Sequence, residues 1–456
     1  MLWRSISLLA AVLLCSAAPT NTTILAEATS GTFNILSLSV DGLPAILDPF
    51  DSSGAEKERN AKYIGIAMSQ YDYGVVNVQK DFSYHTTLYQ HDNHPFRTES
   101  SGSVPFGSGL NTISKYSWVD YSRIEWDQCS NDSGFDCMTR KGFTFMRVRI
   151  DEGVYIDMIN LHADAGTAPS DEEARRWNIR QVSDFISINS IGNAVIVFGN
   201  TNSRYTRSED NLDLFTSQND LTDAWVQAIG GKAPAAGADA IICPKGVPPD
   251  ISCEVVDKVF YRGSPAIHLN SSGFFYDTSR FLSPEGKILT DHHPVRVDFR
   301  YTLKYELRQS DLYGGPHGTW FNDLPSIDPS SKVSFIALCG ASRLDGLIIK
   351  LKSGQILAHG GSGGDCYVLP LRPVEYITSV KLCWGKKGGH TRNFYARATT
   401  NAGRTVQVGT MTDNCAIANA PSGYGVVGTY GQAGDEMDQL GFIYAQQCLD
   451  GKLCSM

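Results

Sequence analysis

The chain has 456 residues, of which 42% are hydrophobic, with 11 cysteines and a formal net charge of -9 at pH 7. This length exceeds what a single hydrophobic core normally organises, so we expect two domains. The acidic balance disfavours a nonspecific grip on nucleic acid, because such a grip depends on lysines and arginines that neutralise phosphates.

Residues 1–18 are predicted to be a cleaved secretory signal. Arg4 precedes an apolar run at residues 8–14, and small residues follow at 16–18. A lipid anchor at Cys15 is disfavoured, because leucines rather than a small residue precede this cysteine. No later run is long and apolar enough to predict a membrane-spanning helix. We therefore expect a secreted, extracellular protein.

The cysteines fit an oxidising compartment. Removing Cys15 from the 11 leaves ten, an even number, which favours disulfides over thiolate metal sites. The close pairs Cys129 with Cys137 and Cys243 with Cys253 are expected to close loops. The pairing of the remaining cysteines stays open: Cys339, Cys366, Cys383, Cys415, Cys448 and Cys454. Acceptor triplets for N-glycosylation, which suit a secreted protein, begin at Asn21, Asn131 and Asn270.

Apolar, strand-like runs that end in polar residues recur through the first domain, residues 31–303. The clearest occupy residues 33–43, 155–165, 194–202, 255–261 and 289–295. Residues 171–188 are expected to be helical, with Ser170 as the N-cap. In their order these runs resemble the endonuclease/exonuclease/phosphatase superfamily, which includes pancreatic-type deoxyribonucleases, inositol polyphosphate phosphatases and neutral sphingomyelinases. The resemblance implies a sandwich of two mixed sheets flanked by helices, whose strand ends meet at one cleft.

A second domain is predicted at residues 312–446, after a short polar connection at 308–315 and before a cysteine-containing tail at 447–456. Its glycine-rich, alternating strands predict an all-β module. The segments 314–323, 360–364, 375–378 and 434–441 resemble the jacalin-like lectins, which are β-prisms of three Greek-key sheets. The predicted fold class is therefore α+β: a two-sheet α/β sandwich of the endonuclease/exonuclease/phosphatase type, followed by an all-β prism.

Four candidate catalytic residues match the superfamily pattern. Asn202 matches the asparagine of its G-D-x-N motif, and Asp291 with His292 matches its S-D-H-x-P motif, with Thr290 in place of serine. The resemblance implies that His292 is the general base and that His162 stabilises charge developing on a phosphate. In the superfamily a divalent metal ion neutralises that phosphate.

Three other positions depart from this pattern. Ser39 stands where asparagine is usual, Lys80 where a metal-binding glutamate is usual, and Asn200 where an aspartate is usual. Hard cations need carboxylate oxygens, so we expect poor magnesium binding and no cofactor. Asn200 also cannot accept a proton as a carboxylate would. The Lys80 ammonium could hold a phosphate directly as a point charge, and the alternative is a solvated lysine at a strand end.

A substitute metal site at His85, His91 and His94 is disfavoured. These histidines lie in one Tyr-rich stretch without a patterned carboxylate. Histidines in such loops more often face solvent or bond to the backbone, so we expect no metal there.

The lectin resemblance implies a sugar site formed by the N-terminal glycine loop at Gly315 and by a G-x-x-x-D loop at residues 434–438. Asp438 would accept two hydroxyl hydrogen bonds, and backbone N–H groups of Gly434, Asp435 and Glu436 would donate. The loop lacks the aromatic residue that relatives often carry, which leaves the preferred sugar open. The alternative is a structural turn in which Asp438 bonds to the local backbone.

Two hypotheses of different classes follow. The first is a secreted carbohydrate-binding protein whose phosphodiesterase-like domain is a pseudoenzyme, because Lys80 and Asn200 replace carboxylates. The second is an active secreted phosphodiesterase or phosphatase, sphingomyelinase- or inositol phosphatase-like and dependent on Mg2+, which its lectin domain delivers to glycans. Residues 160–165 resemble the phospholipid branch more than the nucleases, and the acidic charge disfavours a nuclease. Expected partners are glycans and phosphate esters or phospholipid head groups.

Overall fold

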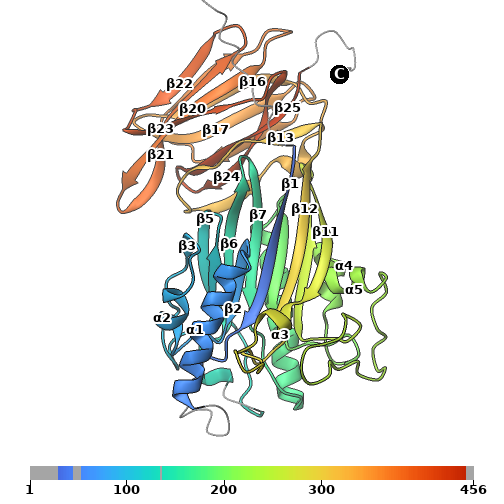
Figure 1. Ribbon diagram of the computed structural model, residues 1–456. Helices are drawn as coiled ribbons and strands as arrows, with labels where there is room; N and C mark the ends of the chain where they lie inside the picture. Colours follow the sequence, from blue (N-terminus) through green and yellow to red (C-terminus); the bar gives the residue numbers. More distant parts are fainter. Residues whose placement is uncertain (1–28, 45–52, 134–135, 448–456) are drawn as a thin grey trace, which may run out of the picture.

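The computed structural model describes residues 29–44, 53–133 and 136–447. The predicted signal, the acceptor at Asn21, the tail cysteines Cys448 and Cys454, and Cys15 lie outside these residues. Figure 1 shows a sandwich of strands and helices, coloured blue to yellow, beneath an all-β unit coloured orange to red. Within the described ranges, the helices are too short or too polar to cross a membrane.

The first unit contains two six-stranded sheets in the described part of residues 30–303. The first sheet, in the order β11-β12-β1-β2-β4-β3, comprises β1 (Ser30–Ser39), β2 (Val75–Gln79), β3 (Phe96–Arg97), β4 (Asn111–Ser114), β11 (Ile267–Tyr276) and β12 (Val295–Leu303). The second, in the order β5-β6-β7-β8-β10-β9, comprises β5 (Trp118–Glu125), β6 (Gly142–Asp151), β7 (Val154–Leu161), β8 (Ala194–Asn200), β9 (Thr222–Asp223) and β10 (Asp257–Arg262).

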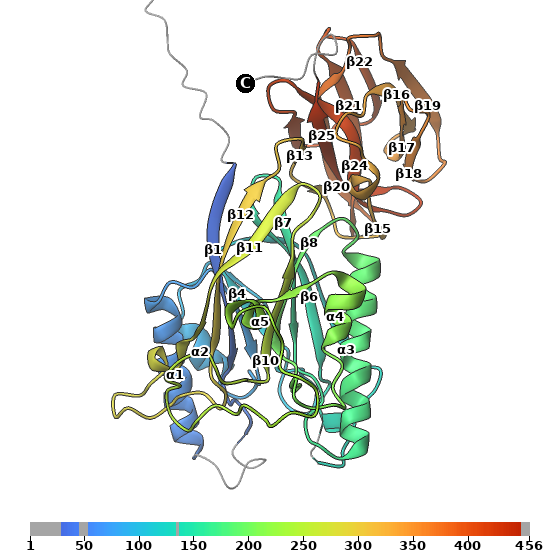
Figure 2. The same cartoon turned by 90° about the vertical axis from the view of Figure 1, so that its right-hand side faces the viewer.

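Helices cover the outer faces of both sheets. They are α1 (Gly54–Gln70), α2 (His85–Gln90), α3 (Pro169–Asn189), α4 (Asp213–Asn219) and α5 (Ala224–Ala228), with short 3-10 turns η2 (Asp136–Met138) and η3 (Asp277–Arg280). Figure 2 shows α1 and α2 on one side of the sandwich and α3 and α4 on the other. The predicted two-sheet sandwich is confirmed.

The sheets face each other through apolar side chains. Every residue of β2, β7 and β8 is buried, which explains why these segments are mainly apolar rather than alternating. Among the polar exceptions, Asn77 and Asn160 donate to carbonyl oxygens of the facing sheet. Strand β1 is parallel to β2, and β7 is parallel to β8, so each pair ends at one edge of its sheet. The Asn160 amide at the end of β7 donates to the Val78 carbonyl oxygen on β2 at 3.1 Å. The two edges therefore lie at the same end of the sandwich.

Helix α3 confirms the helix predicted at residues 171–188, but its start differs. The N-cap is Ala168, and its backbone N–H donates to the Asp171 carboxylate at 3.1 Å. Ser170 lies inside the first turn, and its hydroxyl contacts Asp132 and Ser130. The prediction of Ser170 as the cap is wrong because Pro169, which suits the first helical position, begins the helix upstream.

Three antiparallel sheets form the second unit within residues 307–446, which confirms the predicted prism. Its strands are β13 (Leu307–Gln309), β14 (Tyr313–Gly314), β15 (Thr319–Asn322), β16 (Val333–Gly340), β17 (Leu344–Leu351), β18 (Ile356–Gly360), β19 (Asp365–Pro370), β20 (Ile377–Lys387), β21 (His390–Thr400), β22 (Thr405–Gly409), β23 (Asn414–Asn419), β24 (Tyr424–Ala433) and β25 (Met437–Gln446). The segment predicted as a connection instead supplies β13 and β14, both paired with β25. Polar residues suit these strands because they lie where the prism meets the sandwich.

Disulfides join the cysteines predicted to be close pairs, Cys129 with Cys137 and Cys243 with Cys253. Among the cysteines left open, Cys339 pairs with Cys366 and Cys383 with Cys415. The last two link neighbouring strands within a prism sheet, β16 to β19 and β20 to β23.

A buried arginine joins the two units. Arg147 on β6 has a 1% exposed side chain, and its guanidinium contacts Asp157 at 2.8 Å and Asp120 at 2.7 Å. The same guanidinium lies 3.4 Å from the centre of the Trp320 ring on β15 of the prism. Asp120 also accepts from Gln432 of the prism at 2.8 Å. This charge network therefore spans the junction.

The junction lies at the end of the sandwich where β7 and β8 begin. Asp311 of the prism accepts from the Gly153 backbone N–H at 3.0 Å, just before β7. The Asn322 amide of the prism donates to Asn193 at 3.0 Å, just before β8. The prism is thus attached at the end opposite the one where these strands finish.

We expect Arg147→Met to lower the free energy of unfolding by about 3 kcal/mol or more, because it leaves two buried carboxylates without their cation. Denaturant unfolding followed by tryptophan fluorescence measures this change. Arg140→Met is the matched control: Arg140 and its partner Glu125 are 63% and 61% exposed. That change should cost less than about 1 kcal/mol. Equal losses in the two variants would contradict a role for the buried network.

Candidate functional site

The strand ends gather the sequence-predicted catalytic residues at one place, here called the cleft. Ser39 pairs with Gln79, the residue before Lys80, at the parallel ends of β1 and β2. His162 forms a parallel bridge with Asn200 just beyond β7 and β8. Strand order therefore brings together positions that are far apart in the sequence.

Lys80 leaves β2 in a left-handed backbone conformation, with φ of 56°. Few non-glycine residues adopt this region, and surrounding contacts must hold it. The Gly42 N–H donates to the Lys80 carbonyl oxygen at 2.9 Å, and a Cβ on Gly42 would lie 2.4 Å from that oxygen. The absence of a side chain at Gly42 thus permits the close approach that fixes Lys80.

The Lys80 ammonium forms an ion pair with Asp291. Burial alone would lower the pKa of Lys80, but Asp291, with Asp41 and Asp257, raises it above its usual value. Burial alone would raise the pKa of Asp291, yet Lys80 and His292 hold it well below its usual range. Both partners are therefore charged at neutral pH.

His292 lies between two carboxylates. Its Nδ1 is 3.2 Å from the Asp257 carboxylate, and its Nε2 is 4.0 Å from Asp291. Burial would lower the pKa of His292, but Asp291 and Asp257 outweigh it and raise the pKa. This arrangement orients the imidazole so that Nε2 faces the cleft, as a general base requires.

The two asparagines and His162 occupy the opposite wall. The Asn200 amide nitrogen lies 3.2 Å from His292 Nδ1. Asn202 is tied to the backbone, because its amide donates to the Ala163 carbonyl at 2.8 Å. Burial, together with Lys141 and Lys80, lowers the pKa of His162 well below its usual value. His162 is therefore neutral at physiological pH.

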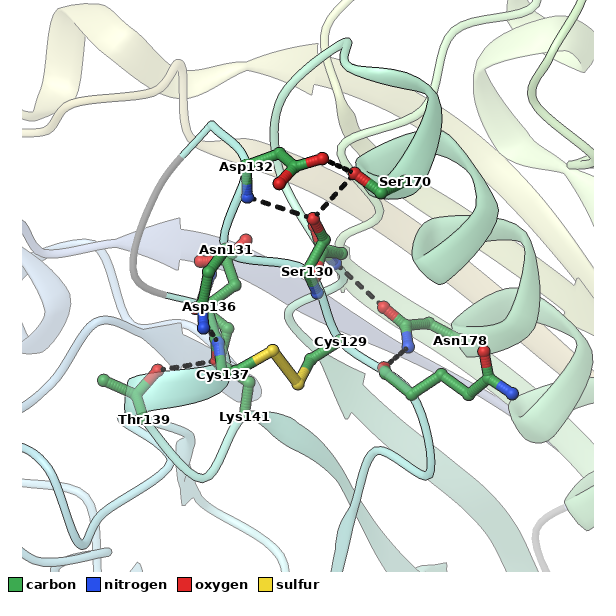
Figure 3. The surroundings of a disulfide bond; sticks show 12 residues. Cys129, Ser130, Asn131, Asp132, Asp136, Cys137, Thr139, Lys141, Ser170 and Asn178 are labelled. Atoms are coloured by element: carbon green, nitrogen blue, oxygen red, sulfur yellow. Dashed lines mark hydrogen bonds and ion pairs between the residues drawn. A yellow bond between two sulfur atoms is a disulfide. The ribbon is translucent and has the colours of Figure 1, made fainter.

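Two residues with clear places in the cleft were not assigned roles from the sequence. Asp257 begins β10 opposite Asn200, and its side chain is 1% exposed beside His292. Its place at the start of a buried strand is the signal that could have found it. Lys141 precedes β6 and pairs with Asp136 of the loop closed by Cys129 and Cys137, as Figure 3 shows. The only sequence signal near Lys141 was the predicted disulfide between Cys129 and Cys137.

The residues present do not fit a divalent metal ion of the type the superfamily uses. Such an ion needs several carboxylate oxygens, but Asp291 is paired with Lys80 and Asp257 with His292. Asp41 is paired with Lys57 at 3.1 Å. Among the described residues, no group of three or more acidic, histidine or cysteine side chains converges to hold an ion. The positive charge beside Asp291 is instead the Lys80 ammonium.

A cavity of about 200 Å³ opens beside the cleft. Its lining includes the cleft residues Asp257, Asp291 and His292, together with Arg204 and His293. It has room for a small polar group, next to the imidazole.

The three histidines that follow β2 have local partners. His85 Nδ1 lies 2.7 Å from Asp81, and His91 Nδ1 lies 2.9 Å from the Thr87 carbonyl. His94 is buried and contacts both Asp92 and the Tyr73 carbonyl. Hydrogen bonding accounts for their positions.

The predicted sugar loop lies between β24 and β25, beside the glycine loop. Gly434 and Asp435 are exposed, and the Gly315 N–H donates to the Asp438 carbonyl at 3.0 Å. The Asp438 carboxylate pairs with Arg392 of β21, a residue that the sequence did not single out. Burial raises the pKa of Asp438 to about 6. Contacts with Arg343 and Lys387 lower the pKa of Glu436 to about 2.

Family models match both parts of the chain. Residues 50–227 match the model described as Endonuclease/Exonuclease/phosphatase family 2, and residues 310–443 match the Jacalin-like lectin domain. The chain therefore combines an endonuclease/exonuclease/phosphatase domain with a jacalin-like lectin domain.

Parts of the chain are also similar to individual proteins. A sphingomyelinase of Mycobacterium tuberculosis is 35% identical over 279 residues, which cover 60% of this chain and 53% of the relative. The chain thus spans about half the length of the curated relatives that it matches first. Sphingomyelinase C from Streptomyces griseocarneus is 17% identical, with a TM-score of 0.42, over 59% of this chain and 99% of that structure. A mannose-binding jacalin-related lectin from Ananas comosus is 23% identical, with a TM-score of 0.28, over 31% of this chain and 99% of the lectin.

We expect Asp257→Asn to lower the pKa of His292, because a carboxylate beside the ring stabilises its charged form. Titration of the His292 ring signals by NMR measures this pKa. Asp250→Asn, the same change on an exposed loop, should leave it unaltered. An unchanged His292 pKa in Asp257→Asn would show that the two side chains are not coupled.

Proposed function

We propose that this protein is an extracellular carbohydrate-binding protein whose phosphodiesterase-type cleft has lost magnesium-dependent hydrolysis. The observation that carries the proposal is the ion pair between Lys80 and Asp291. An ammonium occupies the carboxylate that a metal ion would need, and a magnesium ion cannot share that oxygen without displacing a covalently attached charge.

The change at Asn200 supports the same conclusion. An aspartate there could accept a proton or a hydrogen bond from an attacking water, whereas the Asn200 side chain is a neutral amide, whose nitrogen lies 3.2 Å from His292 Nδ1. The cleft therefore lacks both the metal ligand and one of the groups that activate water.

Carbohydrate binding is supported by the lectin domain. Gly434 and Asp435 are exposed at the tip of the loop that leads to Asp438. The Gly434 N–H, expected to donate to a sugar, instead donates to the Glu436 carbonyl at 3.1 Å, because the loop closes a tight turn there. Arg392 holds the Asp438 carboxylate in place and can donate further hydrogen bonds to a sugar oxygen. Secretion is supported by the disulfides in both domains, which form in oxidising compartments.

An active phosphodiesterase is the alternative, and the pairing of His292 with Asp257 favours it. This pair could still activate water. The similarity to sphingomyelinases then suggests a phospholipid head group as the substrate, with the lectin domain delivering the enzyme to a glycosylated surface.

The first experiment is hydrolysis of sphingomyelin, an inositol phosphate and plasmid DNA by the full chain, with and without magnesium. We expect no turnover above that of His292→Ala. The double variant Lys80→Glu with Asn200→Asp should gain magnesium binding, seen as a rise in melting temperature with millimolar magnesium, because carboxylates then face the ion. Magnesium-dependent turnover by the unmodified chain would establish the alternative.

Glycan binding is tested by retention on immobilised glycans. Asp438→Ala should abolish retention and Asp291→Ala should preserve it, because only the first alters the sugar loop. Retention should also fall as the pH drops through about 6, since protonation removes an acceptor from Asp438, whose pKa is raised to about 6. Glu436, with its pKa near 2, stays ionised across this range. Equal retention of both variants would refute binding at this loop.

A further inference from the structure

We propose that the cleft binds a phosphate ester without any metal ion, and that Lys80 and Lys141 supply the positive charge. Both lysines are close enough to act on His162. This proposal rests on the loss of the magnesium site proposed above. It goes further, because it assigns a ligand class to the altered cleft and gives Lys141 a role in binding that ligand.

Lys80 is positioned to donate to an anion while keeping its own partner. An ammonium has three N–H donors, and Asp291 accepts from one side of the group. The side chain remains 23% exposed, so the other donors are open to the cleft. Its backbone is fixed by the hydrogen bond from Gly42, which limits the freedom that a strand-end lysine would otherwise have.

Lys141 lies on the other wall. Its side chain is 12% exposed and pairs with Asp136. Figure 3 shows this pair beside the disulfide between Cys129 and Cys137, which closes the loop that carries Asp136. The Asp136 carboxylate also accepts from the Ala165 N–H at 2.8 Å. A disulfide-closed loop and the segment after His162 therefore hold the Lys141 partner in place.

His162 lies on the same wall as Lys141. Its backbone N–H donates to the carbonyl oxygen of Gly142, the residue after Lys141, at 3.3 Å. On its other side it bridges to Asn200, which contacts His292. His162 is only 4% exposed, and the Nδ1 atom of its ring has no hydrogen-bond partner among the described residues. A buried ring nitrogen without a partner is costly, and a bound anion would satisfy it.

The surrounding charges suit a phosphate better than a metal ion. The pKa of Lys141 is lowered by burial, with Lys80 adding to the effect, and a bound anion close to Lys141 would stabilise its charged form. The carboxylates that face them already have cations: Asp291 has Lys80, Asp257 has His292, and Asp136 has Lys141. Asp164, close to Lys141, has its pKa raised to about 7 by burial, so it repels an anion less than an ordinary aspartate.

The test is isothermal titration of the full chain with inorganic phosphate in the presence of EDTA. We expect binding by the unmodified chain, and affinity weakened by about tenfold or more in Lys80→Met and in Lys141→Met, as for loss of one charge-assisted hydrogen bond. Lys115→Met is the matched control, because Lys115 also pairs with an aspartate, Asp72, but lies at the opposite end of β2. That variant should bind as the unmodified chain does.

Folding of each variant is checked by circular dichroism, and Lys80→Arg and Lys141→Arg, which keep the charge, should retain measurable binding. Absence of binding in EDTA, binding that requires magnesium, or equal affinity in Lys80→Met, Lys141→Met and Lys115→Met would overturn the proposal. The hydrolysis assay distinguishes the two proposals. Magnesium-dependent turnover overturns the proposed function, whereas no turnover together with no phosphate binding overturns this inference alone.

Discussion

The ion pair between Lys80 and Asp291 sets the chemistry of the whole cleft. In a poorly solvated site a charge is stable only beside its opposite, and each cation here has a carboxylate partner. Lys80 has Asp291, His292 has Asp257, and Lys141 has Asp136. Under the proposed function, the positive charge that a metal ion would supply is built into the chain. Such a charge would not vary with metal supply, but an ammonium cannot lower the pKa of a bound water as a metal ion does.

A second charge network, centred on Arg147, determines how the two domains relate. Asp157 and Asp120 of the sandwich pair with the guanidinium, and Trp320 of the prism packs against it. The prism also supplies the Gln432 and Gln439 amides, which donate to Asp120. An altered orientation of the prism would remove these hydrogen bonds from a buried carboxylate, which favours the observed arrangement.

Much of the fold follows from the sequence because its signals are local. Continuous apolar runs mark strands buried on both faces, and glycine-rich alternation marks the prism. The gathering of Ser39, Lys80 and Asn200 follows from strand ends alone. Non-local partners were beyond reach: Lys141 depends on a loop closed by a disulfide, and Arg392 reaches Asp438 from another sheet of the prism. The short polar segment at residues 308–315 was wrongly predicted to be a connection. It contributes to β13 and β14, which form because β25 pairs with them.

The attachment of the prism at the end of the sandwich where β7 and β8 begin has a further consequence. Strand β7 alone has 8 residues, so roughly 25 Å of sandwich separate the junction from the cleft. In Figure 2 the prism lies at one end of the molecule, and the loops that follow β8 and precede β10 lie at the other. The predicted sugar loop at residues 434–438 is flanked by Gln432 and Gln439, which both donate to Asp120 of the sandwich. A glycan bound at that loop would therefore lie beside the junction, separated from the cleft by the length of the sandwich.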